Sequence, residues 1–224
     1  MKIVQAKKTR NEGWEYLSEN SPLKNPLVLV FGGRFELEDP EIIQDIRKEF
    51  PYENLVFGST SGEIIGEHVF DTSIVVTAIE FEKSSFIVKT ANIFDFDKNA
   101  KLLGEKLIQE LPKEHLKHVF VLSEGSFVNG SALIEGLEVA VNESISLTGG
   151  MCGDGSRFEK TIASYKSNPK EGEVIIIGFY GNSLEISFAS VGGWSPFGPE
   201  RIITKSDGNI LFEIDNLPAL DLYS

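Results

Sequence analysis

Residues 27–33 read Leu-Val-Leu-Val-Phe-Gly-Gly, and residues 39–51 read Asp-Pro-Glu-Ile-Ile-Gln-Asp-Ile-Arg-Lys-Glu-Phe-Pro. The first stretch is a continuous apolar run ended by two glycines, which is typical of a buried strand. The second carries apolar residues at helical spacing. It opens with Asp39, which can accept free backbone N–H groups as an N-cap, and Pro40, which suits the first helical position. The sequence therefore predicts a buried strand and then a helix that ends at Pro51.

The chain continues with short apolar runs rather than with a second long helix. Leu55 to Phe57 reads as another strand and is followed by the glycine-bearing turn Gly58-Ser-Thr-Ser-Gly62-Glu63. Two β-rich runs, Ser73 to Phe81 and Phe86 to Ile93, then read as a hairpin. We predict a unit with the order strand, helix, strand, turn and hairpin.

The same order of elements recurs in the second half of the chain. Val28 and Val119, Gly58 and Gly149, and Gly62 and Gly153 are each 91 positions apart. The apolar face of the first helix falls on apolar residues at the same offset, and Glu63 falls on Asp154. Beyond the turn the offset becomes 98, which requires seven extra residues in a surface loop within residues 165–172. We predict an internal duplication of residues 27–93 and 118–191, joined by a helix over residues 97–111.

These repeats favour the α+β class. Each β-α-β-β-β unit would carry a sheet with a helix behind it, and packing the two open sheet faces together gives a layered α/β/β/α sandwich. One continuous mixed sheet with helices on both faces is the alternative. We expect residues 1–198 to form one duplicated domain. Residues 199–224 are expected to form a hairpin and the start of a helix, because Ile210, Phe212 and Ile214 alternate and a short helical pattern follows.

Composition excludes several classes of partner. Lys and Arg number 21 against 34 Asp and Glu, which gives a net charge of −13 that disfavours nucleic acid and anionic membranes. The apolar runs are shorter than the roughly 20 residues of a membrane span, and Met1 to Gln5 does not begin a signal peptide. The single cysteine, Cys152, excludes an internal disulfide. We expect a cytoplasmic protein.

The two glycine-bearing turns are the candidate ligand site. Consecutive N–H groups and hydroxyls in such turns can bind an anion, and the acidic residue after each glycine can bind an ammonium group, so together they suit a zwitterion such as an amino acid. Purely structural strand-to-strand turns are the alternative. The candidate residues are Ser59, Thr60, Gly62 and Glu63 in the first turn, and Gly150, Cys152, Gly153 and Asp154 in the second.

Enzymatic motifs give no convincing catalytic site. The stretch Gly149 to Arg157 lacks the ending of a P-loop, and no Gly-x-Gly-x-x-Gly fingerprint is present, so we expect no nucleotide or other cofactor. Cys152 reads as an inert buried side chain rather than a nucleophile. His115 and His118 read as solvated residues beside a helix end rather than metal ligands. The acidic residues from Glu36 to Glu41 read as a solvated loop and helix start.

Three motifs in order carry a resemblance to a known family. They are Gly58-Ser-Thr-Ser-Gly-Glu-Ile, Leu147-Thr-Gly-Gly-Met-Cys-Gly-Asp-Gly and Gly193-Trp-Ser-Pro-Phe-Gly-Pro. Together they resemble the FIST domain, named for F-box and intracellular signal transduction proteins, over nearly the whole chain. Met151 and Cys152 depart from the small residues typical of the second turn. The segment from Thr204 to Tyr223 is similar to the passage that leads into the family's C-terminal region.

The resemblance implies an intracellular sensory module that binds a small ligand such as an amino acid. The signal would pass to a partner protein or to a fused output. A protein-interaction adaptor and a small hydrolase-like enzyme are the alternatives. Because the chain stops at Ser224, we expect either an excised piece or a short natural version. The exposed face of the strand Ile210–Ile214 is expected either to be covered by a second chain, as in a homodimer, or to be left partly disordered.

Overall fold

The computed structural model describes residues 1–10, 12–141, 145–189, 192–193 and 195–223. It comprises two compact units, Met1–Ile186 and Ser187–Ser224. The larger unit combines two main sheets with helices, which confirms the predicted α+β class. No helix among the described residues is long and apolar enough to cross a membrane.

The first sheet has six strands in the order β11-β4-β3-β7-β1-β2. Strands β3 and β4 are parallel, and every other neighbouring pair is antiparallel. The strands are β1 (Lys2–Thr9), β2 (Glu15–Tyr16), β3 (Leu27–Gly32), β4 (Asn54–Ser59), β7 (Ser73–Glu80) and β11 (Ala163–Tyr165).

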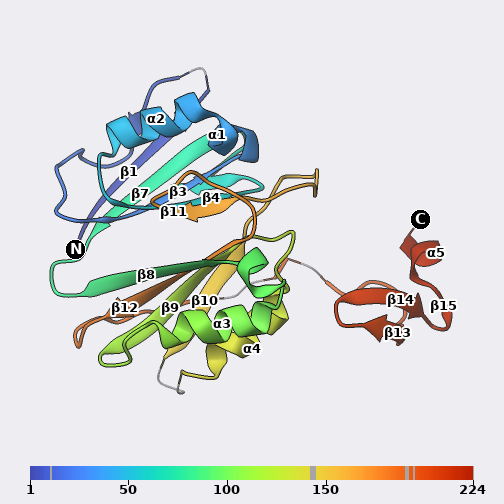
Figure 1. Cartoon of the computed structure of the whole chain (residues 1–224). Helices are drawn as coiled ribbons and strands as arrows, with labels where there is room; N and C mark the ends of the chain where they lie inside the picture. The colour runs from blue at the N-terminus through green and yellow to red at the C-terminus, as the bar shows by residue number, and fades with distance from the viewer. Residues whose placement is uncertain (11, 142–144, 190–191, 194, 224) are drawn as a thin grey trace. The chain divides into compact units, whose positions relative to one another are not determined.

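Helix α2 (Pro40–Glu49) covers the outer face of this sheet (Figure 1). It begins as predicted, because the Asp39 side chain accepts a hydrogen bond from the backbone N–H of Glu41 and Pro40 occupies the first turn. Ile43 and Ile46 belong to one apolar cluster with Val28 and Phe57 of the sheet. The predicted strand and helix at residues 27–50 are thus both present.

The second sheet has four strands in the order β10-β9-β12-β8. Strands β9 and β10 are parallel, and β12 is antiparallel to both of its neighbours. Helices α3 (Ala100–Gln109) and α4 (Gly130–Glu138) cover its outer face (Figure 1) and contribute Leu103, Leu107 and Leu133 to its apolar cluster. The strands are β8 (Ser85–Asn92), β9 (Leu116–Ser123), β10 (Ser146–Met151) and β12 (Glu173–Tyr180).

The inner faces of the two sheets share a third apolar cluster. Leu27 and Val56 come from the first sheet, and Leu122 and Ile175 come from the second. The sheets therefore face each other, with helices on their outer sides (Figure 1). Since no strand ladder among the described residues joins them, they do not form the single continuous sheet of the alternative prediction.

The predicted hairpin of the first repeat is wrong. Strand β7 lies between β3 and β1, whereas β8 pairs with β12 in the other sheet. The reason is that both edges of β7 are already paired, one of them by the N-terminal strand β1, which the sequence reading missed. Likewise, Leu184 lies outside any strand, although the 98-residue offset matched it to Phe86.

The two sheets share a local strand order. β4-β3-β7-β1 in one corresponds to β10-β9-β12-β8 in the other, with the same parallel and antiparallel neighbours. This shared order favours the internal duplication, which stays a prediction. It places β8 in the second repeat, whereas the sequence analysis placed it in the first. The ladders also shift the register by one residue: Phe31 pairs with Gly58, but Leu122 pairs with Gly150 rather than Gly149.

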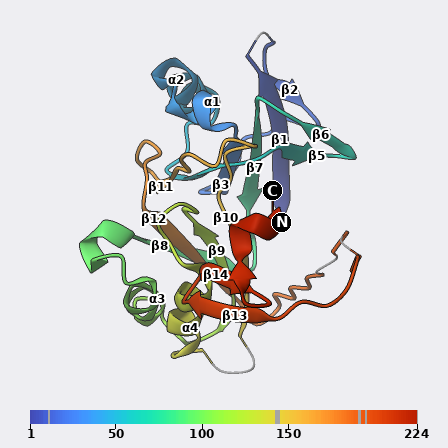
Figure 2. The same cartoon turned by 90° about the vertical axis from the view of Figure 1, so that its right-hand side faces the viewer.

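The predicted second glycine turn begins later than expected, because Gly149 and Gly150 lie within β10. Gly149 has a φ of 154°, and a Cβ built on it would lie 1.9 Å from the backbone oxygen of Val121. Glycine is therefore needed at position 149 for the close approach of β10 to β9. After β4, a small hairpin of β5 (Glu63–Ile65) and β6 (His68–Phe70), also not predicted, projects from the unit (Figure 2).

Six short elements complete the described part of the chain. Helix α1 (Arg34–Glu38) follows β3, and a 3-10 turn (Ile93–Phe96) comes just before the region predicted as the linking helix, in which α3 lies. The smaller unit contains a three-stranded sheet followed by helix α5. Its elements are β13 (Ile203–Asp207), β14 (Ile210–Ile214), β15 (Leu217–Pro218) and α5 (Ala219–Tyr223).

Candidate functional site

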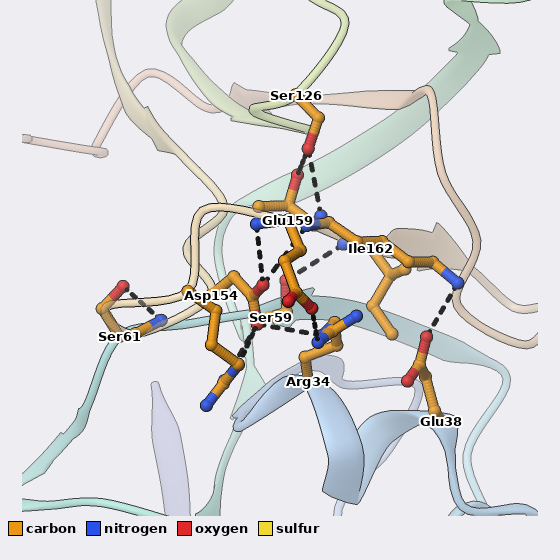
Figure 3. Close-up of polar contacts among 12 residues, drawn as sticks. Arg34, Glu38, Ser59, Ser61, Ser126, Asp154, Glu159 and Ile162 are labelled. Carbon is orange, nitrogen blue, oxygen red and sulfur yellow. Dashed lines mark hydrogen bonds and ion pairs between the residues drawn. The ribbon is translucent and has the colours of Figure 1, made fainter.

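The segments that follow β4 and β10 are joined by hydrogen bonds (Figure 3). The backbone N–H of Gly153 donates to the carbonyl oxygen of Ser59 at 2.8 Å, and that of Gly155 donates to the Ser61 hydroxyl oxygen at 3.0 Å. Both strands are members of a parallel pair, and the carboxyl ends of parallel strands are common places for ligand sites. The two predicted turns thus meet at one edge of the larger unit.

Two cavities flank the segment from Met151 to Gly153. The inter-sheet cavity, of about 310 Å³, includes Phe31, Thr60, Phe120 and Gly150 in its lining. The loop cavity, of about 510 Å³, is lined by residues that follow β9 and β10. Both volumes lie in the range of small-molecule sites. The residues that line both cavities are Ser61, Met151, Cys152 and Gly153.

The loop cavity has a polar and an apolar part. Its carboxylates are those of Asp154 and Glu159, and no Lys or Arg is among its lining residues. Its hydroxyls come from Ser61, Ser126 and Thr161, and its apolar side chains come from Phe127, Met151, Cys152 and Phe158. Such a lining can hold an ammonium group, hydrogen-bond acceptors and an apolar group at the same time.

Asp154 is the anchor of the loop that follows it. Its carboxylate accepts hydrogen bonds from Arg157 Nε at 2.9 Å and from the backbone N–H groups of Glu159 and Lys160 at 3.2 Å (Figure 3). Burial alone would raise the pKa of Asp154. The hydrogen bonds from Arg157 and the two N–H groups, with the charge of Arg34, lower it below its ordinary value instead. Asp154 is therefore an ionised, buried carboxylate.

Arg34 links helix α1 to this loop. Its Nε lies 2.9 Å from Asp154 Oδ1, an ion pair whose angle is not that of a hydrogen bond, and its Nη2 donates to Glu159 Oε2 at 2.9 Å. Glu38 of the same helix forms an ion pair with Lys160 at 2.8 Å. Arg34 and Asp154 are both buried, whereas 64% of the Glu159 side chain is exposed. The charge of Glu159 is therefore the accessible one.

Cys152 is buried between the two cavities. Burial, together with the negative charge of Glu124, raises the pKa of its thiol to about 12. The thiol is thus protonated at neutral pH, the opposite of an activated nucleophile. This agrees with the expectation of a buried, unreactive side chain.

Residues 26–217 match the FIST N domain family. This chain belongs to the FIST N domain family. FIST domains are sensory domains of signal transduction. An uncharacterized protein of Methanocaldococcus jannaschii is 24% identical over 198 residues, which cover 82% of this chain and 37% of the relative. The chain thus spans little more than a third of that relative's length.

The predicted site residues of this FIST N domain divide between the cavities. Of these two cavities, Ser59, Thr60 and Gly150 line the inter-sheet cavity, and Asp154 lines the loop cavity. Cys152 and Gly153 line both.

Gly62 and Glu63 line neither of these two cavities. The Glu63 carboxylate is buried and accepts hydrogen bonds from the Thr60 hydroxyl at 2.5 Å and from the hydroxyl and N–H of Ser73 at 2.6 and 3.2 Å. It fixes the start of β5 against the start of β7. The geometry therefore favours a structural role for Glu63 over contact with a ligand.

Sequence reasoning missed two buried charges of this FIST N domain beside the loop cavity. Arg34 follows Gly33 at the carboxyl end of β3. Glu124 follows β9 and accepts hydrogen bonds from the N–H groups of Ser126 and Phe127 and from the Thr161 hydroxyl. Both come within two residues of the end of a strand that the structure shows to be parallel to a neighbour, and the position after a predicted strand was the available signal.

Two expectations about polar residues of the FIST N domain are wrong. His118 is not solvated: it lies on β9 with 3% exposed, and its ring nitrogens contact the hydroxyls of Ser146 and Thr148 at 2.7 and 2.8 Å. Burial lowers its pKa. Glu36 is also buried, because residues 34–38 form helix α1 rather than a solvated loop. No cluster of three or more potential metal ligands occurs in the described ranges.

Proposed function

We propose that this chain is a cytoplasmic sensory domain that binds a small zwitterion of the amino acid class in the loop cavity. The observation that carries the proposal is the junction of the two turns, which lines one cavity with accessible carboxylate and hydroxyl groups. Membership of a sensory family supports it. The signal would pass to a partner protein or to a fused output.

The two charged ends of the ligand have different partners in this proposal. The Ser61 oxygen accepts from Gly155, so its hydroxyl hydrogen can donate to the ligand's carboxylate. The Ser126 hydrogen would turn to the ligand from a long contact of 3.4 Å with the Thr161 hydroxyl, whose own hydrogen goes to Glu124. The ligand's ammonium group would pair with the carboxylate of Glu159 and lie near that of Asp154. Of the predicted turn residues, Cys152, Gly153 and Asp154 would contact the ligand. Ser59 joins the two turns through its carbonyl oxygen, and Thr60 and Glu63 hold the first turn against β7.

A thermal-shift screen of the common amino acids tests the proposal. A ligand at about 100 times its Kd adds roughly 2.7 kcal/mol of stability, which is a readily measured shift. In calorimetry, Glu159→Gln should weaken the amino acid found by about tenfold, because one charge-assisted contact is lost.

Glu15→Gln is the matched control for this substitution. Glu15 is equally exposed, at 64%, and is also ion-paired, to Lys7, but it lies on β2 and lines neither cavity. The proposal is wrong if no amino acid stabilises the protein, or if the two variants bind the ligand equally well.

A protein-interaction role is the second candidate, and the free edge of β10 favours it. An apolar cavity of about 440 Å³ runs beside this end strand, lined among others by Leu133, Ile134, Leu147 and Met151. A second copy that pairs with this edge would form a homodimer. Light scattering of the wild type and of Ile134→Lys tests it: a dimer that the lysine abolishes supports this candidate, and a monomeric wild type contradicts it.

A further inference from the structure

Phe158 occupies an unfavourable position for a phenylalanine in two respects. Its side chain is 91% exposed, and its φ is 53°, in the left-handed region that bulky residues rarely adopt. Exposure forgoes the burial of a large apolar ring, and the left-handed backbone costs conformational free energy. Neither cost is offset by packing of the ring, so the fold alone does not explain Phe158.

The loop holds Phe158 in place through its neighbours. Arg157 on one side and Glu159 on the other are both tied to the buried carboxylate of Asp154, and Glu159 is tied in addition to Arg34. The backbone N–H of Arg157 also donates to the carbonyl oxygen of Asp154 at 3.2 Å. The ring is therefore presented by a fixed loop, so little entropy is lost when something packs against it.

Phe158 lines the loop cavity together with two other exposed apolar side chains, Phe127 and Met151. Phe127 already has partners, because its ring contacts that of Phe94 at 5.0 Å and Lys98 Nζ lies 4.9 Å from its centre. No ring or cation is placed over Phe158 in the described part of the chain. The accessible carboxylate of Glu159 is the next residue in sequence.

We propose that Phe158 is a specificity-determining residue of the loop cavity, which selects a ligand with an aromatic ring next to its ammonium group. The ring would pack on Phe158 and Met151, and the ammonium would pair with Glu159. This inference rests on the proposed function for the location of the site, and it names the ligand's side chain. Small or acidic amino acids lack the group that the exposed ring can contact.

Calorimetry with L-phenylalanine, L-alanine and 2-phenylethylammonium tests the inference on the full chain. Phe158→Asn removes the ring, and asparagine tolerates the left-handed backbone, so the loop keeps its conformation. We expect the wild type to bind L-phenylalanine more tightly than L-alanine. Phe158→Asn should weaken L-phenylalanine by about two- to tenfold, the usual worth of an aromatic pair, and leave L-alanine unchanged.

Two further variants keep the result interpretable. Phe158→Tyr retains the ring and should bind L-phenylalanine like the wild type. Phe197→Asn removes another fully exposed phenylalanine, from the smaller unit, and should change nothing. The inference is overturned if L-phenylalanine and L-alanine bind equally, or if Phe158→Asn weakens both by the same factor.

The probes also separate this inference from the proposed function. If 2-phenylethylammonium binds in a Phe158-dependent way while neither amino acid binds, the aromatic site stands and the zwitterionic ligand falls. If L-alanine binds as tightly as L-phenylalanine, the proposed function stands and the role of Phe158 falls. If none of the three binds, the role of Phe158 falls, and the screen of the common amino acids decides the proposed function separately.

Discussion

Asp154 is the residue on which the loop cavity depends most directly. Its carboxylate accepts hydrogen bonds from backbone N–H groups of the loop, which fixes the loop's conformation. It also neutralises the charge of Arg34, which is buried beside it. A buried ion pair adds little net stability when both partners are present, because each ion has lost its hydration. Removing one partner is different, since the other charge is then left buried and uncompensated.

Asp154→Asn should therefore destabilise the protein strongly, by about 3–5 kcal/mol, because Arg34 loses its buried counter-charge and keeps only the exposed Glu159, and because the loop loses an acceptor. Denaturant unfolding of the variant measures this. Asp45→Asn is the control: Asp45 pairs with Lys8 at 2.6 Å but is more than a third exposed, so its loss should cost about 1 kcal/mol or less. Equal effects of the two substitutions would contradict the anchoring role of Asp154.

The pH dependence of stability follows from the same carboxylate. The pKa of Asp154 in the fold lies below its ordinary value of 3.8, so the folded state binds this proton less readily than the unfolded chain does. Its contribution is complete above about pH 4 to 5 and is lost as the pH falls through the folded-state pKa. We expect the stability of Asp154→Asn to fall less steeply than that of the wild type between pH 5 and pH 3. Parallel curves from chemical denaturation would show that Asp154 is not the group responsible.

At the scale of elements, sequence patterns predicted the helices and strands whose conformation depends on neighbouring residues. The run from Leu27 to Phe31 gave β3, and the Asp39-Pro40 pair gave the start of α2. Strand partners could not be predicted in the same way, because pairing is a tertiary choice. β1 carries three lysines among its eight residues and buries only Val4 and Ala6, so it reads weakly as a strand, yet it occupies the edge of β7 that the predicted hairpin needed.

The same limit applies to the candidate site, where contacts between residues distant in sequence could not be predicted. The repetition of glycine turns pointed to Cys152 and Asp154, which line the loop cavity, and their role at a ligand stays a prediction. The role of Glu63 could not be read, because its partner Ser73 lies on β7, ten residues beyond the turn. Arg34 was missed for a similar reason: it reaches Asp154 across 120 residues, and only the contact between the sheets brings them together.

Gly150 allows the two cavities to be tested separately. It lines the inter-sheet cavity but not the loop cavity, and its ladder partner Leu122 packs between the sheets. A Cβ at position 150 meets no heavy atom within 4 Å. Gly150→Leu should therefore fold normally, reduce the inter-sheet cavity and leave amino acid affinity unchanged in calorimetry.

Gly13→Leu is the control for Gly150→Leu. It adds the same side chain at an exposed glycine that is equally free of neighbours. A loss of affinity in Gly150→Leu, with none in Gly13→Leu, would move the ligand from the loop cavity to the inter-sheet cavity.

At the scale of the whole molecule, the ion pairs that bind the loop to α1 connect the two sheets at their polar edge. Arg34 and Glu38 belong to the first half, and Asp154, Glu159 and Lys160 belong to the second. A ligand whose ammonium competes with Arg34 for Glu159 would act on this connection. The site thus lies where a small charge could alter the contact between halves, as a sensory domain requires.

The larger unit should fold without the smaller one. All three apolar clusters lie within Met1–Ile186, whereas the large apolar side chains described in Ser187–Ser224 are mostly exposed. The lining of the loop cavity runs from Ser61 to Thr161 and is also complete within the larger unit.

A chain of residues 1–186 should therefore unfold cooperatively, with a Tm within a few degrees of the full chain, and bind the same amino acid with unchanged affinity. Scanning calorimetry and titration calorimetry measure the two properties. The family match extends to residue 217, beyond the end of this shortened chain, so the experiment also tests whether the extra residues contribute. A shortened chain that folds but binds at least tenfold more weakly would place part of the site in residues 187–224, and one that fails to unfold cooperatively would show that the smaller unit completes the core.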